Sequence, residues 1–145
     1  MSQYRHILLA VDLSDESLTV AERAAALAQQ SSAKLSMVHV IEPINFAYGG
    51  DIPMDLTTIQ DQLDEYAHEK MAEFAKPYNI GPENQHIAVG LPQNEIHRIA
   101  KELQVDLIVV GTHGRHGLSL LLGSTSNGVL HGAECDMLAV RVGEH

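Results

Sequence analysis

The sequence predicts an α/β protein: a single doubly wound (Rossmann-like) domain with a five-stranded parallel sheet and helices on both faces. Short apolar runs alternate with stretches of helical periodicity in the order βαβαβαβαβ, which is typical of parallel sheets. Several runs are apolar throughout, as expected for strands covered on both faces. The 145 residues suit one core and contain no internal repeat or linker, so we expect one domain over residues 1–145.

Two strands and two helices are expected in the first half of the chain. Residues 6–11 (HILLAV) and 35–41 form the strands, and Ser14 can cap a helix between them. The apolar positions of that helix have helical spacing, at Leu18, Ala21, Ala25 and Ala28. Residues 43–55, with two adjacent glycines and two prolines, are too long for a routine connection and predict an irregular segment. A long helix follows and ends at Pro77, with one apolar face made of Ile59, Leu63, Tyr66, Ala67, Met71 and Phe74.

The second half of the chain predicts three strands and two helices. Residues 85–89 form a weak strand, and Pro92 suits the first turn of a helix with apolar positions at Ile96, Ile99, Ala100 and Leu103. Residues 106–110 (DLIVV) give the strongest strand signal of the sequence. A short helix is expected near residues 124–131, and the last strand spans residues 137–142, from Met137 to Val142.

Composition and charge restrict the function classes. Apolar residues make up 45% and charged residues 19%, as in ordinary globular proteins. No apolar stretch approaches the roughly 20 residues that span a bilayer, and the opening MSQYRH lacks a signal-peptide pattern, so we expect no membrane association. The formal charge of −10 argues against nucleic acid as the main partner. A lone cysteine, Cys135, fits a reducing compartment, and we expect a cytoplasmic protein.

The expected strand order, 3-2-1-4-5, places a ligand site at one edge of the sheet. A doubly wound sheet reverses its winding beside strand 1, and ligands bind at the carboxyl ends of the strands that flank this reversal. Strands 1 and 4 are those neighbours. Asp12 follows the first and Gly111 follows the second, so two positions about a hundred residues apart are expected to converge.

A glycine-rich segment, VVGTHGRHGLSLLLGSTSN at residues 109–127, follows strand 4. Glycines let the backbone approach a ligand closely, and amides at a helix N-terminus bind phosphate without a lysine. Gly111 and Gly114 would shape the turn, Gly123, Ser124 and Thr125 would supply donors, and Arg115 would add a guanidinium. Residues 107–133 contain no carboxylate although the chain has 19. The segment therefore predicts a phosphate site, with a polar turn whose serines cap a helix as the alternative.

These features together resemble the universal stress protein family over almost the whole chain. The matching stretches are HILLAVD with Ser14, the strand end His39-Val40, residues 90–92 (GLP), residues 106–114 (DLIVVGTHG), and residues 123–140. In the ATP-binding branch of that family the motif is a glycine, two residues, a glycine, nine residues, then a glycine and Ser or Thr. Here eight residues separate Gly114 from Gly123. All three glycines are present, which places the chain nearer to the ATP-binding branch.

The resemblance implies a role for each matching position. Asp12 would face the ribose or the adenine edge, Val40 would pack against adenine, Val110 and Gly111 would line the pocket, and the motif glycines with Ser124 would meet the phosphates. From the residues alone, Asp12 can also be a turn-forming aspartate and Val40 a core residue. The complete predicted site is Ala10, Val11, Asp12, Val40, Val110, Gly111, His113, Gly114, Arg115, Gly123, Ser124 and Thr125.

The sequence predicts binding rather than dedicated catalysis. No P-loop lysine and no glycine-rich loop after strand 1 are present, so at most slow ATP hydrolysis is expected. His113 and His116 lie three residues apart, but a transition-metal site needs three or four ligands. We therefore expect no such site, and only Mg²⁺ that arrives with the nucleotide phosphates. The acidic neighbours of Cys135 disfavour a thiolate and a redox role.

The resemblance also implies a homodimer. Strand 5 lies at a sheet edge in the expected order, and family members commonly pair through this strand. The main hypothesis is thus a dimeric protein that binds ATP, ADP or AMP and has a regulatory or protective role in the stress response, with an unknown protein partner that reads a surface such as residues 42–56. One alternative is a dimer that binds no nucleotide and acts through protein contacts. The other is an ATP-consuming transferase or hydrolase.

Overall fold

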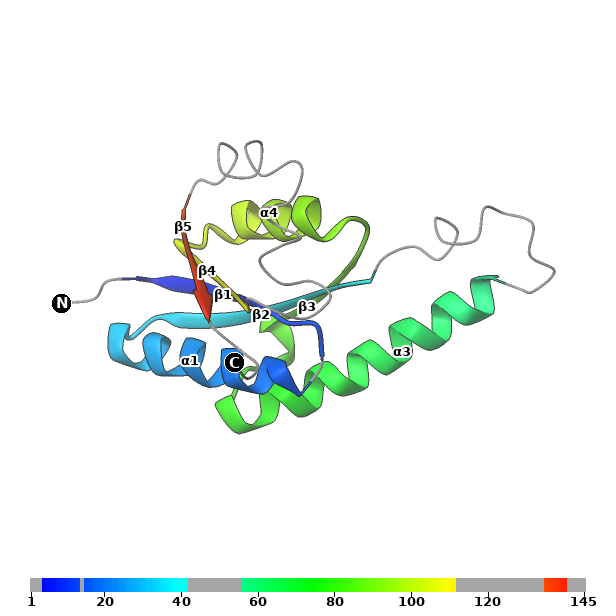
Figure 1. The fold of residues 1–145 in the computed structure, drawn as a ribbon, viewed down its shortest axis with the longest axis horizontal. Helices are drawn as coiled ribbons and strands as arrows, with labels where there is room; N and C mark the ends of the chain where they lie inside the picture. Colours follow the sequence, from blue (N-terminus) through cyan, green and yellow to red (C-terminus); the bar gives the residue numbers. More distant parts are fainter. Residues whose placement is uncertain (1–3, 14, 42–55, 112–134, 141–145) are drawn as a thin grey trace.

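The fold is a five-stranded parallel sheet of order β3-β2-β1-β4-β5, which confirms the predicted fold class (Figure 1). The computed structural model describes residues 4–13, 15–41, 56–111 and 135–140. The strands are β1 (His6–Ala10), β2 (Lys34–Ile41), β3 (Gln85–Val89), β4 (Leu107–Gly111) and β5 (Asp136–Val140). The helices are α1 (Glu16–Ser31), α3 (Leu56–Ala75) and α4 (Pro92–Leu103), with short 3-10 helices η1 (Lys76–Tyr78) and η2 (Pro82–Asn84).

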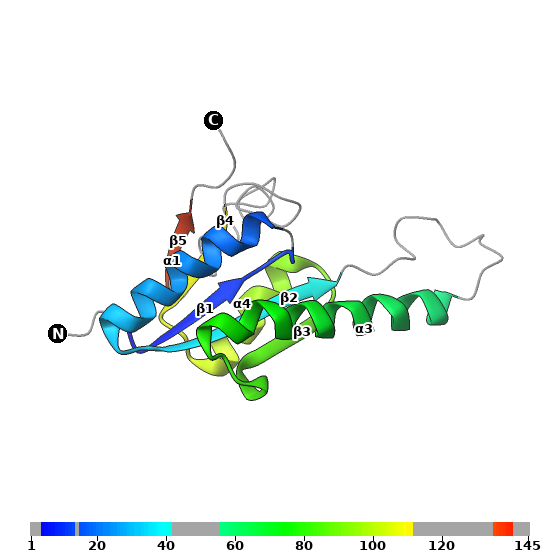
Figure 2. The ribbon, with the colours of Figure 1, turned by 90° about the horizontal axis from the view of Figure 1, so that it is seen from below.

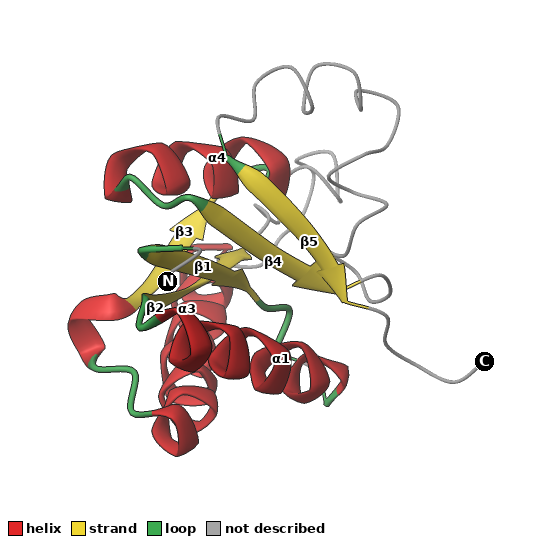
Figure 3. Cartoon of the chain, turned by 90° about the vertical axis from the view of Figure 1, so that its left-hand side faces the viewer, coloured by secondary structure: helices red, strands yellow, loops and turns green. Residues whose placement is uncertain are grey.

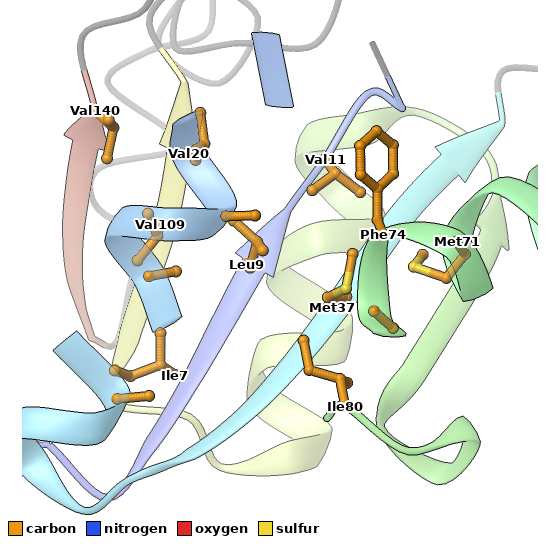
Figure 4. Close-up of a cluster of buried hydrophobic side chains, with 14 of the residues drawn as sticks. Ile7, Leu9, Val11, Val20, Met37, Met71, Phe74, Ile80, Val109 and Val140 are labelled. Atoms are coloured by element: carbon orange, nitrogen blue, oxygen red, sulfur yellow. The ribbon is translucent and has the colours of Figure 1, made fainter. Parts of the chain in front are cut away.

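Helices cover the sheet on opposite faces (Figure 3): α1 and α3 pack on one face and α4 on the other. Successive strand residues point to opposite faces, so each strand contributes to two cores. Ile7 and Leu9 of β1 pack with α1 and α3 (Figure 4), whereas Leu8 between them packs with α4. All three side chains are fully buried. This explains why the strands are apolar throughout rather than at every second residue.

Most predicted elements lie where the sequence places them, with small shifts at their ends. Strand β1 ends at Ala10, one residue early, and β5 begins at Asp136, one residue early. Helix α3 begins at Leu56 and ends at Ala75, after which Pro77 lies within η1. Pro92 lies in the first turn of α4, as predicted. Ser14 and the predicted structure of residues 43–55, 124–131 and 141–142 lie outside the described residues.

The buried face of α1 differs from the predicted one. Leu18 is 41% exposed, and the buried residues of α1 are Ser17, Val20, Ala21, Ala24, Ala28 and Ser31. The stripe is rotated because Ser17, rather than Leu18, faces the sheet and makes hydrogen bonds at the end of β1. Asp15 is the N-cap residue of α1 and makes no capping hydrogen bond through its side chain. The exposed Leu18 therefore contributes little to the core.

A polar cluster lies at the amino end of the sheet, beneath the end of α4. The carboxylate of Asp106 accepts hydrogen bonds from the backbone amides of Arg5 (2.9 Å) and His6 (3.1 Å). The His6 ring lies 2.7 Å from the hydroxyl of Ser36 and 3.2 Å from the carbonyl oxygen of Leu103. Ser36 is fully buried. These bonds satisfy polar groups that would otherwise be costly inside the sheet.

No helix within the described residues has both the length and the apolar character needed to cross a membrane.

Candidate functional site

The carboxyl ends of β1 and β4 form the switch point of the sheet, because β1 lies between β2 and β4 and the winding reverses there. In the parallel register Leu9 pairs with Val109 on one side, and Ala10 pairs with Val38 on the other. Beyond these pairs the chain continues into Asp12 after β1 and into Gly111 at the end of β4. The predicted convergence of these two strand ends is therefore confirmed (Figure 2).

Asp12 is fixed by a reciprocal pair of hydrogen bonds with Ser17 in the first turn of α1. The backbone amide of Asp12 donates to Oγ of Ser17 at 3.1 Å, and the Ser17 hydroxyl donates to Oδ1 of Asp12 at 2.6 Å. Between the two, Leu13 has a φ of 64°, a left-handed conformation that leucine rarely adopts. This sharp turn keeps a half-buried carboxylate at the start of a helix, where the helix dipole stabilises negative charge.

His39 of β2 holds the backbone of Val11, next to Asp12. The Nδ1–H of His39 donates to the carbonyl oxygen of Val11 at 2.9 Å, and the amide of Val11 donates to the carbonyl oxygen of Val38 at 3.0 Å. Burial lowers the pKa of His39, although its hydrogen bond to Val11 and the charge of Asp12 act in the opposite direction. A neutral ring with the proton on Nδ1 is thus favoured near neutral pH.

The valines of the predicted site are buried in the two cores of the sheet, Val11 on the face of α1 and α3 and the other two on the face of α4. Val11 is 4% exposed, Val40 is 3% exposed and Val110 is fully buried. Val40 and Val110 belong to the core cluster on the α4 face, and Ala10 packs against that cluster. In the register of β1 and β2, Val40 lies two positions beyond the residue that pairs with Ala10, level with Asp12. Val40 is thus a core residue in this structure, and its contact with adenine stays a prediction.

The structure brings half of the predicted site together. Ala10, Val11, Asp12, Val40, Val110 and Gly111 all lie at the carboxyl ends of β1, β2 and β4. His113, Gly114, Arg115, Gly123, Ser124 and Thr125 lie outside the described residues, so the phosphate-binding half stays a prediction. Within the described residues, no group of three His, Cys, Asp or Glu side chains could hold a metal ion.

Sequence reasoning missed two residues of this site, Ser17 and His39. Ser17 had no signal of its own, because its contact with Asp12 depends on the left-handed turn at Leu13. His39 did have a signal, since it is a histidine within the apolar half of β2, between Val38 and Val40. A polar side chain that is shielded from water needs a hydrogen-bond partner. The position of His39 near the end of β2 would have placed that partner at the switch point.

The strand order, with its reversal beside β1, defines a doubly wound α/β protein. The family model described as "Universal stress protein family" matches residues 3–141, and the chain belongs to that family. Two universal stress protein A homologs of Coxiella burnetii are each 43% identical to it. The first alignment covers 94% of this chain and 96% of the relative, and the second covers 98% of each.

Solved structures share the same fold. The structure of protein MJ0577 is 26% identical, covers 98% of this chain and 99% of its own, and superposes with a TM-score of 0.75. A universal stress protein in complex with cAMP is 26% identical, with a TM-score of 0.64 and coverage of 97% and 98%. The universal stress protein UspA of Lactobacillus plantarum, at 24% identity and a TM-score of 0.73, supports the fold alone.

Proposed function

We propose that this protein binds an adenine nucleotide (ATP, ADP or AMP) at the switch point and has a regulatory or protective role in the stress response. The observation that carries the proposal is the Asp12 carboxylate, oriented by Ser17 at the end of β1. A carboxylate there can accept hydrogen bonds from ribose hydroxyls without approaching the phosphates. The glycine segment would supply the phosphate contacts, and Mg²⁺ would arrive with the phosphates.

A relative in complex with cAMP supports this proposal, since cAMP combines the same adenine, ribose and phosphate groups. Three motif glycines, at 111, 114 and 123, give it further support. A cytoplasmic location belongs to the proposal as well, since the chain has one cysteine. Any hydrolysis of the bound nucleotide would be slow, because no P-loop lysine is present.

Titration calorimetry with ATP and Mg²⁺ tests the proposal, with Asp12→Ala compared with Asp15→Ala as the matched control. Both changes remove one carboxylate near the start of α1, and only Asp12 is bonded to Ser17. We expect Asp12→Ala to weaken affinity about tenfold, the effect of losing roughly one charge-assisted hydrogen bond. Gly114→Val should abolish binding if the glycine segment holds the phosphates. Equal affinity in all variants, with intact thermal unfolding, would refute the site.

A dimer that binds no nucleotide is the second candidate, and the spacing of the glycine motif favours it. Eight residues separate Gly114 from Gly123, one fewer than the nine of the ATP-binding motif. In a nucleotide-binding site, a loop one residue shorter would place the amides of Gly123 and Ser124 differently. Absence of adenine absorbance in the supernatant of the denatured protein, together with no heat on titration with ATP, ADP or AMP, would favour this candidate.

A further inference from the structure

A chain of polar contacts in the polar cluster joins four elements at the amino end of the sheet. Nδ1 of His6, on β1, lies 3.2 Å from the carbonyl oxygen of Leu103 at the end of α4. Nε2 of the same ring lies 2.7 Å from Oγ of Ser36 on β2. That Oγ lies 3.5 Å from Oδ1 of Asn84 in η2. The chain thus runs from α4 through β1 and β2 to η2.

The carbonyl group of Leu103 sets the direction of this chain while His6 is neutral. A carbonyl oxygen can only accept, so the single ring proton lies on Nδ1 and Nε2 is an acceptor. The Ser36 hydroxyl therefore donates to Nε2, in agreement with their short separation of 2.7 Å. A hydroxyl has one proton and cannot serve Asn84 as well. The 3.5 Å contact is accordingly long for a hydrogen bond between two oxygens.

A proton on His6 changes what Ser36 must do. The charged ring carries hydrogen on both nitrogens, so Nε2 becomes a donor. Ser36 is fully buried, so water cannot replace it as the acceptor. We propose that the chain reverses when His6 takes up a proton: Nε2–H donates to Oγ of Ser36, and the Ser36 hydroxyl turns to donate to Oδ1 of Asn84. The side chain of Asn84 is then bonded to β2 in the acid state only, which makes the contact between η2 and the sheet dependent on pH.

The surroundings of His6 determine the pH at which the chain reverses. Burial lowers the pKa of His6, and its bond to the Leu103 carbonyl opposes this effect. Three charged side chains in the described part of the chain also act on the ring: Lys34 of β2 and His86 of β3, which lower the pKa, and Asp106 before β4, which raises it. Glu102 of α4 acts on His86. Since the pKa is lowered overall, the reversal falls below the ordinary histidine value of about 6.5.

Nitrogen-15 NMR of the wild-type protein tests the neutral state without any substitution. Long-range couplings between the ring nitrogens and carbon-bound protons identify which nitrogen carries the proton. At pH 8 we expect the proton of His6 on Nδ1, with Nε2 as the acceptor. A His6 ring with its proton on Nε2 at pH 8 would overturn the proposal, because the chain would then already have the direction assigned to the acid state.

Asn84→Ala tests the acid state, because it removes the acceptor that only the reversed chain uses. We expect the NMR titration midpoint of His6 to move to lower pH by about half a unit, roughly a threefold loss of proton affinity, as one weak hydrogen bond is lost. Asn94→Ala, an exposed asparagine on α4, is the matched control and should leave the midpoint of His6 unchanged. An unchanged midpoint in Asn84→Ala would overturn the proposal.

A double-mutant cycle tests whether Asn84 acts through the hydroxyl of Ser36. In a Ser36→Ala background, Asn84→Ala should leave the midpoint of His6 unchanged, because the link between them is absent. An equal shift in both backgrounds would show a direct effect of Asn84 and overturn the proposal. Urea unfolding gives a second readout. Asn84→Ala lowers the folded-state pKa of His6 further, so it should cost more stability at pH 5 than at pH 8. An equal loss at the two pH values would count against the reversal.

Discussion

The Ser17 hydroxyl donates a 2.6 Å hydrogen bond to Oδ1 of Asp12 and accepts a 3.1 Å bond from the Asp12 amide. One buried serine thus fixes both the backbone and the carboxylate of the second residue after β1. In a doubly wound sheet this residue lies at the position where ligands bind. Its orientation is therefore a structural property of the β1–α1 turn before any ligand arrives.

Ser17→Ala should weaken both the fold and the proposed site. The Asp12 amide loses its acceptor in a half-buried place, so we expect the free energy of unfolding to fall by about 1–2 kcal/mol in urea titrations. Affinity for ATP should fall several-fold, because the carboxylate is no longer held. Thr19→Ala, at an exposed position of the same helix, should leave both quantities unchanged. A loss of stability with unchanged affinity would show that Ser17 has no part in orienting Asp12 for a ligand.

The sequence predicts the sheet well because its signal is local and strong. Residues 107–110 are four consecutive buried apolar residues, as expected for a strand covered on both faces. Alternation and crossover handedness restrict the topology to a few doubly wound sheets, and the order expected among them, 3-2-1-4-5, is the one observed. The strand ends, and with them Asp12 and Gly111, could therefore be placed from the sequence.

The sequence does not determine which apolar residues of a helix are buried when this depends on how the helix lies on the sheet. The spacing of Ile59, Leu63 and Tyr66 is that of a buried stripe, yet Leu63 and Tyr66 are exposed, and nothing in the spacing tells how far the sheet extends beneath the helix. Leu18 is similar: it is more apolar than Ser17, but Ser17 is buried and Leu18 is exposed in the helix that follows the left-handed residue Leu13. The contact between Asp12 and Ser17 follows from the same turn. Such features can be predicted only when the backbone geometry is known.

Asp106→Ala should destabilise the fold, because it removes a carboxylate from the polar cluster at the amino end of the sheet. The carboxylate accepts hydrogen bonds from the amides of Arg5 and His6, and bonds to a charged acceptor contribute about 1.5–3 kcal/mol. We expect a decrease of about 2 kcal/mol in the free energy of unfolding, measured in urea. Asp136→Ala is the control: this exposed carboxylate accepts one bond from the hydroxyl of Tyr4, and its loss should cost under about 1 kcal/mol. Equal losses would show that the polar cluster is dispensable.

Stability should decrease below neutral pH because of partly buried histidines. Burial lowers the pKa of His6, His39, His86 and His97. A histidine with a lowered pKa binds fewer protons when folded, so its contribution is complete above the unfolded pKa of about 6.5 and is lost as pH falls toward the folded pKa. Urea unfolding between pH 8 and pH 5 should show this decrease. Each histidine can add a slope of at most about 1.4 kcal/mol per pH unit.

His97→Leu tests the contribution of one of these histidines to stability. Its Nε2 atom is buried and has no hydrogen-bond partner among the described residues, and burial is the cause of its lowered pKa. Replacing it with leucine should stabilise the protein by about 1 kcal/mol at pH 6 and flatten the pH dependence. His68→Leu, at an exposed position on α3, should have neither effect. A steeper acid slope for His97→Leu would contradict this account.

The edge strand β5 leads to a prediction about assembly. Among the described strands β4 is its one partner, and Ala139 within β5 is exposed. If two copies pair through this strand, as the sequence analysis predicts, a lysine there should block the approach of the second edge. We expect Ala139→Lys to shift the protein from dimer to monomer in analytical ultracentrifugation. Val89→Lys, on the opposite edge strand β3 and 50% exposed, should leave the dimer intact. Dissociation by Val89→Lys alone would place the interface at the β3 edge, and a monomeric wild-type protein would exclude pairing through β5.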